Sequence, residues 1–289
     1  MALELRGLSV TGWIGRILRR AALYLLLATI GLTMILPLAC MVSTSFKQPQ
    51  AVFTLVPQWI PNPLDWTNYV KIWRVVPLFR FFLNSVIVAT CVTAGHVFAS
   101  ACAAYAFARL KFPGRDALFF AYIATMMIPG SVTIIPVFIL MKWFGWVDTY
   151  QALIIPGIFS AFGTFLLRQF FLTISQDVED AAKIDGASTY RIFWRIILPM
   201  SKPALAALTI STFMGNWQSF MWPLLVVDSV EKKTLPIGLT YFQELYQYAN
   251  PNWPLLMAAS LVAMLPIILL FVFNQRYFIG GIRLTGVQR

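Results

Sequence analysis

The sequence contains few charged residues. Only 11% of its 289 residues are Asp, Glu, Lys or Arg, whereas 59% are hydrophobic. A soluble domain carries about a quarter charged residues, and so few polar side chains would leave the surface of a water-soluble protein uncovered. The composition therefore excludes an ordinary soluble enzyme or binding domain and indicates a membrane protein.

Cysteine and histidine are also scarce, with three cysteines and one histidine in the chain. Cys40, Cys91 and Cys102 all lie inside apolar runs, without metal-ligand spacing and without a partner in a loop. We interpret them as packing residues. The sequence therefore predicts neither a disulfide framework nor a metal centre.

Six charge-poor stretches are long enough to cross a hydrocarbon core of about 30 Å. They cover residues 21–42, 82–107, 117–141, 151–167, 204–227 and 255–275. No Asp, Glu, Lys or Arg lies inside them, although proton- and ion-driven pumps use such intramembrane groups. The remaining candidate, His96, either hydrogen-bonds between packed helices, which we favour, or titrates near neutral pH.

The sequence lacks the groups of an intramembrane or nucleotide-hydrolysing enzyme. One histidine without a buried carboxylate does not supply the paired groups that most hydrolytic mechanisms need. The chain has no Gly-Lys dipeptide, and hence no phosphate-binding loop of the GxxxxGK[ST] kind. We expect a non-catalytic chain that binds no cofactor of its own.

The formal charge of +11 comes from short basic clusters between the apolar runs and not from a stripe that would suit nucleic acid. Fifteen of the 22 Lys and Arg residues lie on one side of the six predicted spans and seven on the other. The positive-inside rule then places both termini in the cytoplasm. We expect a cytoplasmic N-terminal segment (1–20), a membrane domain (21–278) with outer loops (43–80 and 228–254), and a cytoplasmic tail (279–289).

Several predicted spans contain prolines. Neighbouring helices or a water-filled cavity can satisfy the backbone groups that proline frees at membrane depth. The prolines therefore fit either a conduit between helices or ordinary kinks in a packed bundle. They are Pro129, Pro136, Pro156, Pro223 and Pro266.

The loop at residues 173–203 carries eight charges and cannot be buried in lipid. Its pattern predicts helix, turn, helix. Ser175 can cap a first helix with acids in its opening turn, and Gly186 stands where a left-handed stop is needed. Ser188 can cap a second helix, which we expect to end before Pro199. The loop either inserts its slim first helix into a partner's groove or rests on the membrane as an amphipathic linker.

The stretch EDAAKIDGASTYRIFWRIILP, residues 179–199, resembles the EAA loop of binding-protein-dependent ABC transporter permeases. With its flanking residues it is similar to the carbohydrate-uptake subfamily of the maltose type, over residues 79–278. The resemblance implies an all-α membrane protein with six transmembrane helices, a cytoplasmic coupling loop and the type I ABC importer permease fold. Asp180 departs from the usual glutamate and shortens the side chain by one methylene. The implied ATPase-coupling residues are Glu179, Asp180, Ala181, Ala182, Asp185, Gly186, Ile196, Leu198 and Pro199.

The resemblance also implies partners and a mechanism. Two ATPase subunits would hold the ATP and magnesium, and a second permease would complete the pathway. An extracytoplasmic solute-binding protein would deliver the cargo, and the pair of permeases would work by alternating access in a bacterial or archaeal cytoplasmic membrane.

Two segments resemble cargo-handling parts of that family. In the fifth span, Gln218 and Ser219 replace an Asn and an acid, which suits a neutral sugar; alternatively Trp217 and Trp222 belong to an interfacial aromatic belt. The predicted substrate-path residues are Asn84, Ser85, Asn216, Trp217, Gln218 and Trp222. In the second outer loop, the residues expected to contact the binding protein, or else merely to pack on the bundle, are Tyr241, Phe242, Tyr246, Tyr248, Asn250 and Asn252.

Three functional hypotheses follow. The favoured one is the permease subunit of an importer for a sugar or oligosaccharide. A second keeps the same machinery but assigns a glycerophosphodiester or charged oligosaccharide as cargo. A third, from another class, is a self-contained channel or membrane scaffold.

Overall fold

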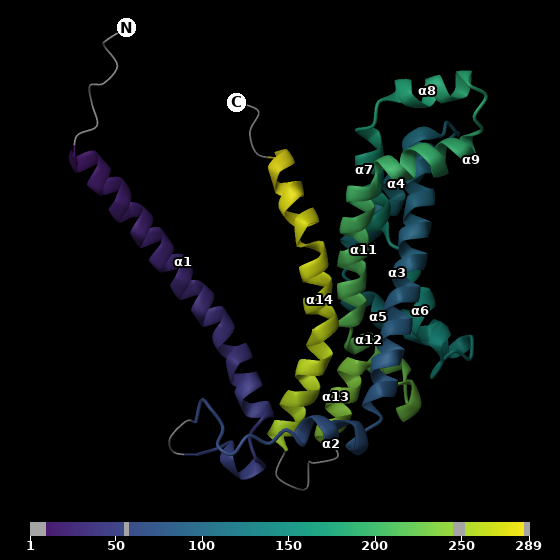
Figure 1. Cartoon of the computed structure of the whole chain (residues 1–289). Helices are drawn as coiled ribbons and strands as arrows, with labels where there is room; N and C mark the ends of the chain where they lie inside the picture. Colours follow the sequence, from purple (N-terminus) through teal and green to yellow (C-terminus); the bar gives the residue numbers. More distant parts are fainter. Residues whose placement is uncertain (1–9, 55–57, 245–251, 286–289) are drawn as a thin grey trace. The chain divides into compact units, whose positions relative to one another are not determined.

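The computed structural model describes residues 10–54, 58–244 and 252–285, and every regular element in those ranges is helical (Figure 1). The chain divides into two compact units. One comprises residues 1–72 and 251–261, and the other comprises residues 73–250 and 262–289. Each unit is described by itself.

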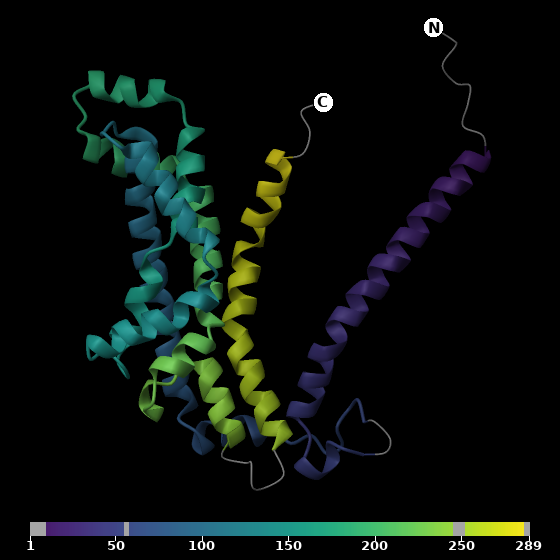
Figure 2. The ribbon, with the colours of Figure 1, turned by 180° about the vertical axis from the view of Figure 1, so that it is seen from behind.

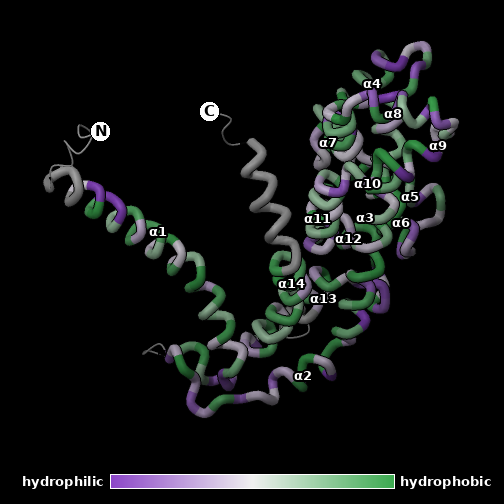
Figure 3. Tube along the Cα trace, turned by 45° about the horizontal axis from the view of Figure 1, so that its top comes forward, coloured by the Kyte–Doolittle hydropathy of each residue, from purple (hydrophilic) through white to green (hydrophobic). Residues whose placement is uncertain are grey.

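The first unit contains α1 (Val10–Ser45) and the short turn η1 (Pro49–Ala51). Figure 3 shows a hydrophilic stretch near the start of α1, followed by a mostly hydrophobic length. At the far end of α1, Asn68 donates hydrogen bonds from its Nδ2 to the carbonyl oxygens of Ser45 and Lys47, at 3.0 and 2.9 Å. This buried amide fixes the start of α2 (Asn68–Val75) against the end of α1.

The second unit is built around α3 (Leu78–Arg109), which packs against α6 (Tyr150–Ile158), α7 (Ala161–Leu172) and α11 (Lys202–Trp217). Figures 1 and 2 show α11 running beside α3. The other elements of the unit are α4 (Arg115–Ala124), η2 (Thr125–Met127), α5 (Gly130–Trp143), α8 (Gln176–Ile184), α9 (Thr189–Ile192), η3 (Phe193–Ile197), α10 (Leu198–Met200), α12 (Met221–Val226), η4 (Val230–Lys232) and α13 (Leu235–Glu244). The last helix, α14 (Trp253–Thr285), begins in the first unit and continues in the second.

Two apolar clusters hold the second unit together. One joins Tyr105 of α3, Phe171 of α7 and Ile197 of η3 near the end of α3 that leads to α4. The other joins Val92 of α3 and Leu153 of α6 to the residues around α12. Because α3 contributes to both clusters, it connects the two ends of the unit.

By length and composition, four described helical segments can cross a membrane, or up to six if each bent pair is one span. The four are Gly15–Ser45, Leu78–Arg109, Tyr150–Leu172 and Trp253–Val272. The pair Arg115–Met127 and Gly130–Trp143 bends by 101°, and the pair Thr189–Met200 and Lys202–Trp217 bends by 77°.

Three predicted spans, at 117–141, 151–167 and 204–227, each contain a break between two α-helices. The span expected at 117–141 breaks before Pro129, since proline offers no N–H to a continuing helix. The span expected at 204–227 ends at Trp217. A continuous helix would drive the ring of Pro223 against the carbonyl of Ser219, and the chain instead breaks and places Pro223 in the first turn of α12.

We expect Gly163→Ala to destabilise the second unit. A Cβ at Gly163 would lie 2.5 Å from both His96 Nε2 and Ser100 Oγ, so these buried side chains or the helices that carry them would have to shift. Such overpacking costs about 1–3 kcal/mol. The measurement is the Tm of the purified chain in mild detergent. Gly215→Ala, at a helical position with no atom within 4 Å of the added Cβ, is the control, and equal Tm values for the two variants would contradict the expectation.

Candidate functional site

The predicted coupling loop forms the helix and turn expected of it. Ser175 caps α8, because its Oγ accepts a hydrogen bond from the Asp177 N–H at 3.2 Å. Asp177 and Glu179 occupy the first turn, where a negative charge suits the helix dipole. Gly186 follows the helix with a φ of +77°, and its N–H donates to the Lys183 carbonyl at 2.9 Å. Left-handed backbone of this kind favours glycine.

The second helix of the loop begins as predicted and ends differently. The Oγ of Ser188 caps α9 by accepting from the Arg191 N–H at 3.3 Å. The expected end before Pro199 was wrong: the helix continues as a π turn over Phe193–Ile197 and then as α10 to Met200. The π turn pairs the N–H of Leu198 with the carbonyl of Phe193, and this wider turn precedes the proline that lacks an N–H.

One face of α8 and its turn is exposed and carries acidic side chains together with apolar ones. Asp177, Asp180 and Asp185 are exposed, and the Asp180 carboxylate forms an ion pair with Lys183 at 2.9 Å. Beside them, the side chains of Ile184 and Tyr190 are 87% and 73% exposed. Figure 3 shows the hydrophilic colour of α8 at its end of the second unit. An apolar contact surrounded by negative charge fits a groove with an apolar floor and a basic rim.

The other face of the loop packs inward. Ala182, Ile196 and Leu198 lie against the apolar cluster of α3 and α7. Glu179 is only 3% exposed, and its Oε1 lies 2.9 Å from Arg109 Nε, an ion-pair distance although the N–H is not aligned along it. The nine predicted coupling residues thus divide between an outer and an inner face. Those on the outer face are Asp180, Ala181, Asp185, Gly186 and Pro199.

Two predicted path residues, Asn84 and Ser85, fasten the segment that leads to α13. Asn84 is 2% exposed. Its Nδ2 donates to the carbonyls of Glu231 and Lys233, both at 2.9 Å, and its Oδ1 accepts from the Tyr150 hydroxyl at 2.7 Å. The Ser85 Oγ accepts from the Leu235 N–H at 2.7 Å. In this structure both side chains hydrogen-bond to backbone groups. Their place on a substrate path stays a prediction.

The remaining path candidates surround the break between α11 and α12. Trp217 is 3% exposed, and its Nε1 donates to the Ala263 carbonyl at 3.1 Å. Trp222 donates from Nε1 to the Ala152 carbonyl at 2.9 Å. Asn216 donates to the Thr212 carbonyl at 2.8 Å, whereas Gln218 is exposed. Both indole N–H groups therefore donate to carbonyls of other helices in the unit. The alternative prediction, that the two tryptophans belong to an interfacial aromatic belt, did not include these contacts.

The predicted binding-protein contacts are only partly described. Tyr241 lies on α13, and Lys233 Nζ is 5.5 Å from the centre of its ring. Asn252 Oδ1 accepts from the Leu255 N–H at 3.4 Å at the start of α14. The backbone of Phe242 is in α13, and Tyr246, Tyr248 and Asn250 lie outside the described residues.

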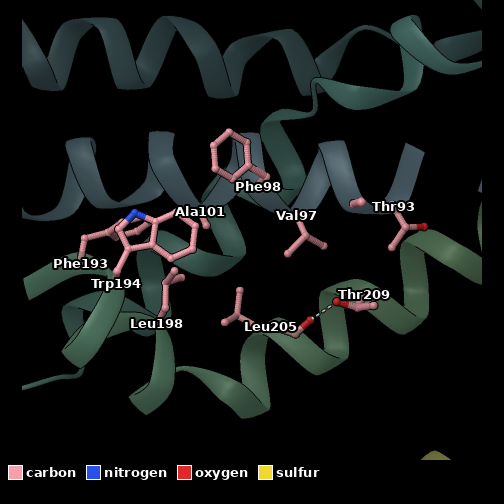
Figure 4. A pocket seen from close by; sticks show the side chains of 10 residues that line it. Thr93, Val97, Phe98, Ala101, Phe193, Trp194, Leu198, Leu205 and Thr209 are labelled. Atoms are coloured by element: carbon pink, nitrogen blue, oxygen red, sulfur yellow. Dashed lines mark hydrogen bonds between the residues drawn. The ribbon is translucent and has the colours of Figure 1, made fainter. Parts of the chain in front are cut away.

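An apolar pocket of about 280 Å³ lies between α3, η3 and α11 (Figure 4). Its side chains include Phe98 and Trp194, and the Thr209 hydroxyl on its wall is already bonded to the Leu205 carbonyl at 2.7 Å. A sugar needs several polar groups that converge on it. This pocket suits apolar groups instead, and none of the predicted substrate-path residues lines it.

Sequence reasoning missed Asp148, which lies between α5 and α6 with a φ of 58°. Its Oδ1 accepts from the N–H and the hydroxyl of Ser229, at 3.0 and 2.8 Å, and its Oδ2 lies 3.1 Å from Lys232 Nζ. Burial alone would raise the pKa of Asp148, but the bonds from Ser229 and Lys232 outweigh it and hold the pKa below its ordinary value. No local pattern marks these residues, because they are about 80 positions apart in the chain.

Comparison with known proteins identifies the family. Residues 95–284 match the model of the "Binding-protein-dependent transport system inner membrane component" family. The chain belongs to this family. Its members are the non-catalytic membrane subunits of importers that depend on a binding protein, so the predicted permease family is confirmed.

Several relatives and structures resemble this permease. It is 35% identical to the arabinooligosaccharides transport system permease protein AraQ of Halalkalibacterium halodurans, over 90% of this chain and 94% of that one. It is 36% identical to the sn-glycerol-3-phosphate transport system permease protein UgpE of Pectobacterium atrosepticum, over 81% and 85%. A chain in the crystal structure of a bacterial ABC transporter that imports the acidic polysaccharide alginate shares the fold, with a TM-score of 0.82, 23% identity, and coverage of 94% and 99%.

We expect Asp148→Asn to destabilise the permease by on the order of 1–2 kcal/mol at neutral pH, because hydrogen bonds to a charged acceptor are lost. The folded-state pKa of Asp148 lies below the unfolded value of 3.8. Its stabilisation is therefore complete above that value and disappears as the pH falls through the lower, folded-state pKa.

The Tm of the variant and of the wild type should differ at pH 7, begin to converge as the pH falls below about 4, and coincide only below the folded-state pKa of Asp148. Asp228→Asn is the control, since the backbone N–H of Asp228, and not its carboxyl, contributes to this network. A constant difference across the pH range would contradict the assignment.

Proposed function

We propose that this chain is one of two permease subunits of an ATP-driven importer, and that its cargo is a sugar or oligosaccharide. A second permease would pair with it, and two separate ATPase subunits would hydrolyse ATP with magnesium. The observation that carries the proposal is the exposed face of α8, where three carboxylates surround protruding apolar side chains. A short helix of this kind fits a groove in a cytoplasmic ATPase.

The proposed orientation places α8 in the cytoplasm. The domain boundaries expected from the sequence belong to the same proposal, with a cytoplasmic N-terminal segment, two outer loops and a cytoplasmic tail, in a bacterial or archaeal inner membrane. Charge supports this orientation, because the basic residues concentrate in the segments on the α8 side of the spans. The Asp148 network would then lie on the outer side, near the residues proposed to contact the binding protein.

In the proposed mechanism, ATP binding closes the two ATPases and brings the coupling helices of both permeases together. The paired permeases then change from an inward-facing to an outward-facing state as a rigid-body switch. The loaded binding protein would dock outside, on the segment that includes Tyr241 and Asn252, and release its cargo into the opened path.

A neutral saccharide is the favoured cargo. Gln218 is exposed at the break between α11 and α12, and no acidic or basic residue lies between Asn216 and Pro223. Amides and aromatic rings recognise hydroxylated rings without ionic groups. The similarity to an arabinooligosaccharide permease supports this cargo.

An anionic cargo is the second candidate, namely a glycerophosphodiester or a charged oligosaccharide. It is favoured by the similarity to the glycerol-3-phosphate permease and to the alginate importer. The complex should be purified from its native membrane in mild detergent and its chains identified by mass spectrometry. Arabinotriose, sn-glycerol 3-phosphate and an alginate trisaccharide should then be tested for binding to the isolated binding protein by calorimetry.

We expect an ATPase, a second permease and a binding protein in fixed ratio, with arabinotriose bound in preference to the two anions. Preference for either anion would replace the neutral cargo with the second candidate. Isolation of the chain without any ATPase would overturn the proposed function itself.

We expect Gly186→Asp to uncouple the complex. The measured quantity is the stimulation factor, defined as the ATP hydrolysis rate with the loaded binding protein divided by the rate without it. Aspartate at a φ of +77° is strained by about 1–2 kcal/mol and distorts the turn that ends α8. The stimulation factor should fall at least about tenfold, a change that corresponds to a typical coupling free energy. The chain should still insert in the membrane.

Gly114→Asp is the matched control, because Gly114 has a φ of +79° and open space around it but lies in the turn between α3 and α4 and not in the turn that ends α8. An equal loss of stimulation in both variants would show that backbone strain alone is responsible and would contradict the role of the α8 turn.

A further inference from the structure

We infer that Arg109 and Glu179 form a buried ion pair that transmits the movement of α8 to α3 and α7. This inference rests on the proposed function and deepens it. Among the acidic residues of α8, Glu179 points inward: the exposed fraction of its side chain is 4%, against 54% for Asp180 beside it. The structure therefore assigns it a role different from that of its neighbour.

Three elements meet at the guanidinium of Arg109, the last residue of α3. Its Nε lies 2.9 Å from Glu179 Oε1 on α8. Its Nη2 donates to the carbonyls of Phe171 and Ile174, both at 2.6 Å, at the end of α7. Phe171 lies in the last turn of α7 and Ile174 lies two residues beyond its end, where a cation is favourable. One planar group thus fixes the distances among α3, α7 and α8.

The burial of this pair decides what Glu179 contacts. The side chains of Arg109 and Glu179 are 8% and 4% exposed, so the carboxylate is not available to a partner that docks on the outer face of α8. Separating the two charges would leave each of them buried and uncompensated, which is strongly unfavourable. We assign Glu179 as a positioning residue inside the permease and leave the ATPase contact to the exposed face.

Ala182 also joins α8 to the second unit by packing against the apolar cluster, and apolar contact is non-directional, so it permits sliding. The ion pair is different, because separating two buried charges is strongly unfavourable. The Glu179 carboxylate therefore stays beside the Arg109 guanidinium when α8 moves. Displacement of α8 by the ATPase is therefore transmitted at Arg109 to the ends of α3 and α7. Since α3 contributes to both apolar clusters, the displacement would reach the opposite end of the unit.

The experiment compares Glu179→Gln, Glu179→Asp and the double variant Arg109→Met/Glu179→Met in the complete complex. Asp116→Asn is the control, because Asp116 also pairs with an arginine, at 2.8 Å, but its side chain is 62% exposed and lies on α4. For each complex that elutes intact on gel filtration, the stimulation factor by the co-purified binding protein is measured, together with the Tm.

We expect the stimulation factor of Glu179→Gln to fall about tenfold, that of Glu179→Asp to recover part of this loss, and that of Asp116→Asn to match the wild type. The double variant removes both charges while it nearly keeps the volume, but it also removes the donor of the Phe171 and Ile174 carbonyls. We expect it to regain part of the Tm that Glu179→Gln loses, without regaining the stimulation factor.

Wild-type stimulation in Glu179→Gln would overturn the inference. So would a double variant that regains both the Tm and the stimulation, because the pair would then act on stability alone. Failure of the proposed function is distinguishable, since the wild-type complex itself would then show no stimulation by the binding protein.

Discussion

The hydrocarbon core of a membrane offers no water to backbone N–H and C=O groups, and this constraint shapes the second unit. Where its helices break or end, other side chains satisfy the exposed backbone. In α6, Pro156 has no N–H to offer the Ala152 carbonyl four residues before it, and the indole N–H of Trp222 donates to that carbonyl instead. At the end of α7, Arg109 binds two carbonyls. These polar side chains permit irregular backbone in an otherwise apolar protein.

The same constraint places polar contacts at both ends of α3. Asn84 and Ser85 bind the backbone of the segment before α13, and Arg109 binds α7 and α8. Between them, a glycine of α7 allows the close approach of His96 on α3. The result is a long helix that is fixed to the segment before α13 at one end and to α7 and α8 at the other.

Helix α8 and the turn that follows it have two faces with opposite requirements. The outer face must be exposed to meet a partner, and it carries Asp180 and the protruding Ile184. The inner face must be held firmly, and it buries the neighbouring Glu179 against a cation. A helix places adjacent residues about 100° apart, so two acids in sequence can serve the two faces.

The sequence by itself determined the all-α membrane class, the two helices of the charged loop, their caps at Ser175 and Ser188 and the left-handed Gly186. Each of these depends on composition or on interactions within a few residues. It could not place the break after Trp217, the burial of Glu179 or the network of Asp148, and it marked Asn84 as polar without its backbone partners. Those features join residues 46 or more positions apart. Only tertiary structure decides them, because the packing of helices, and not the local sequence, selects which polar groups meet.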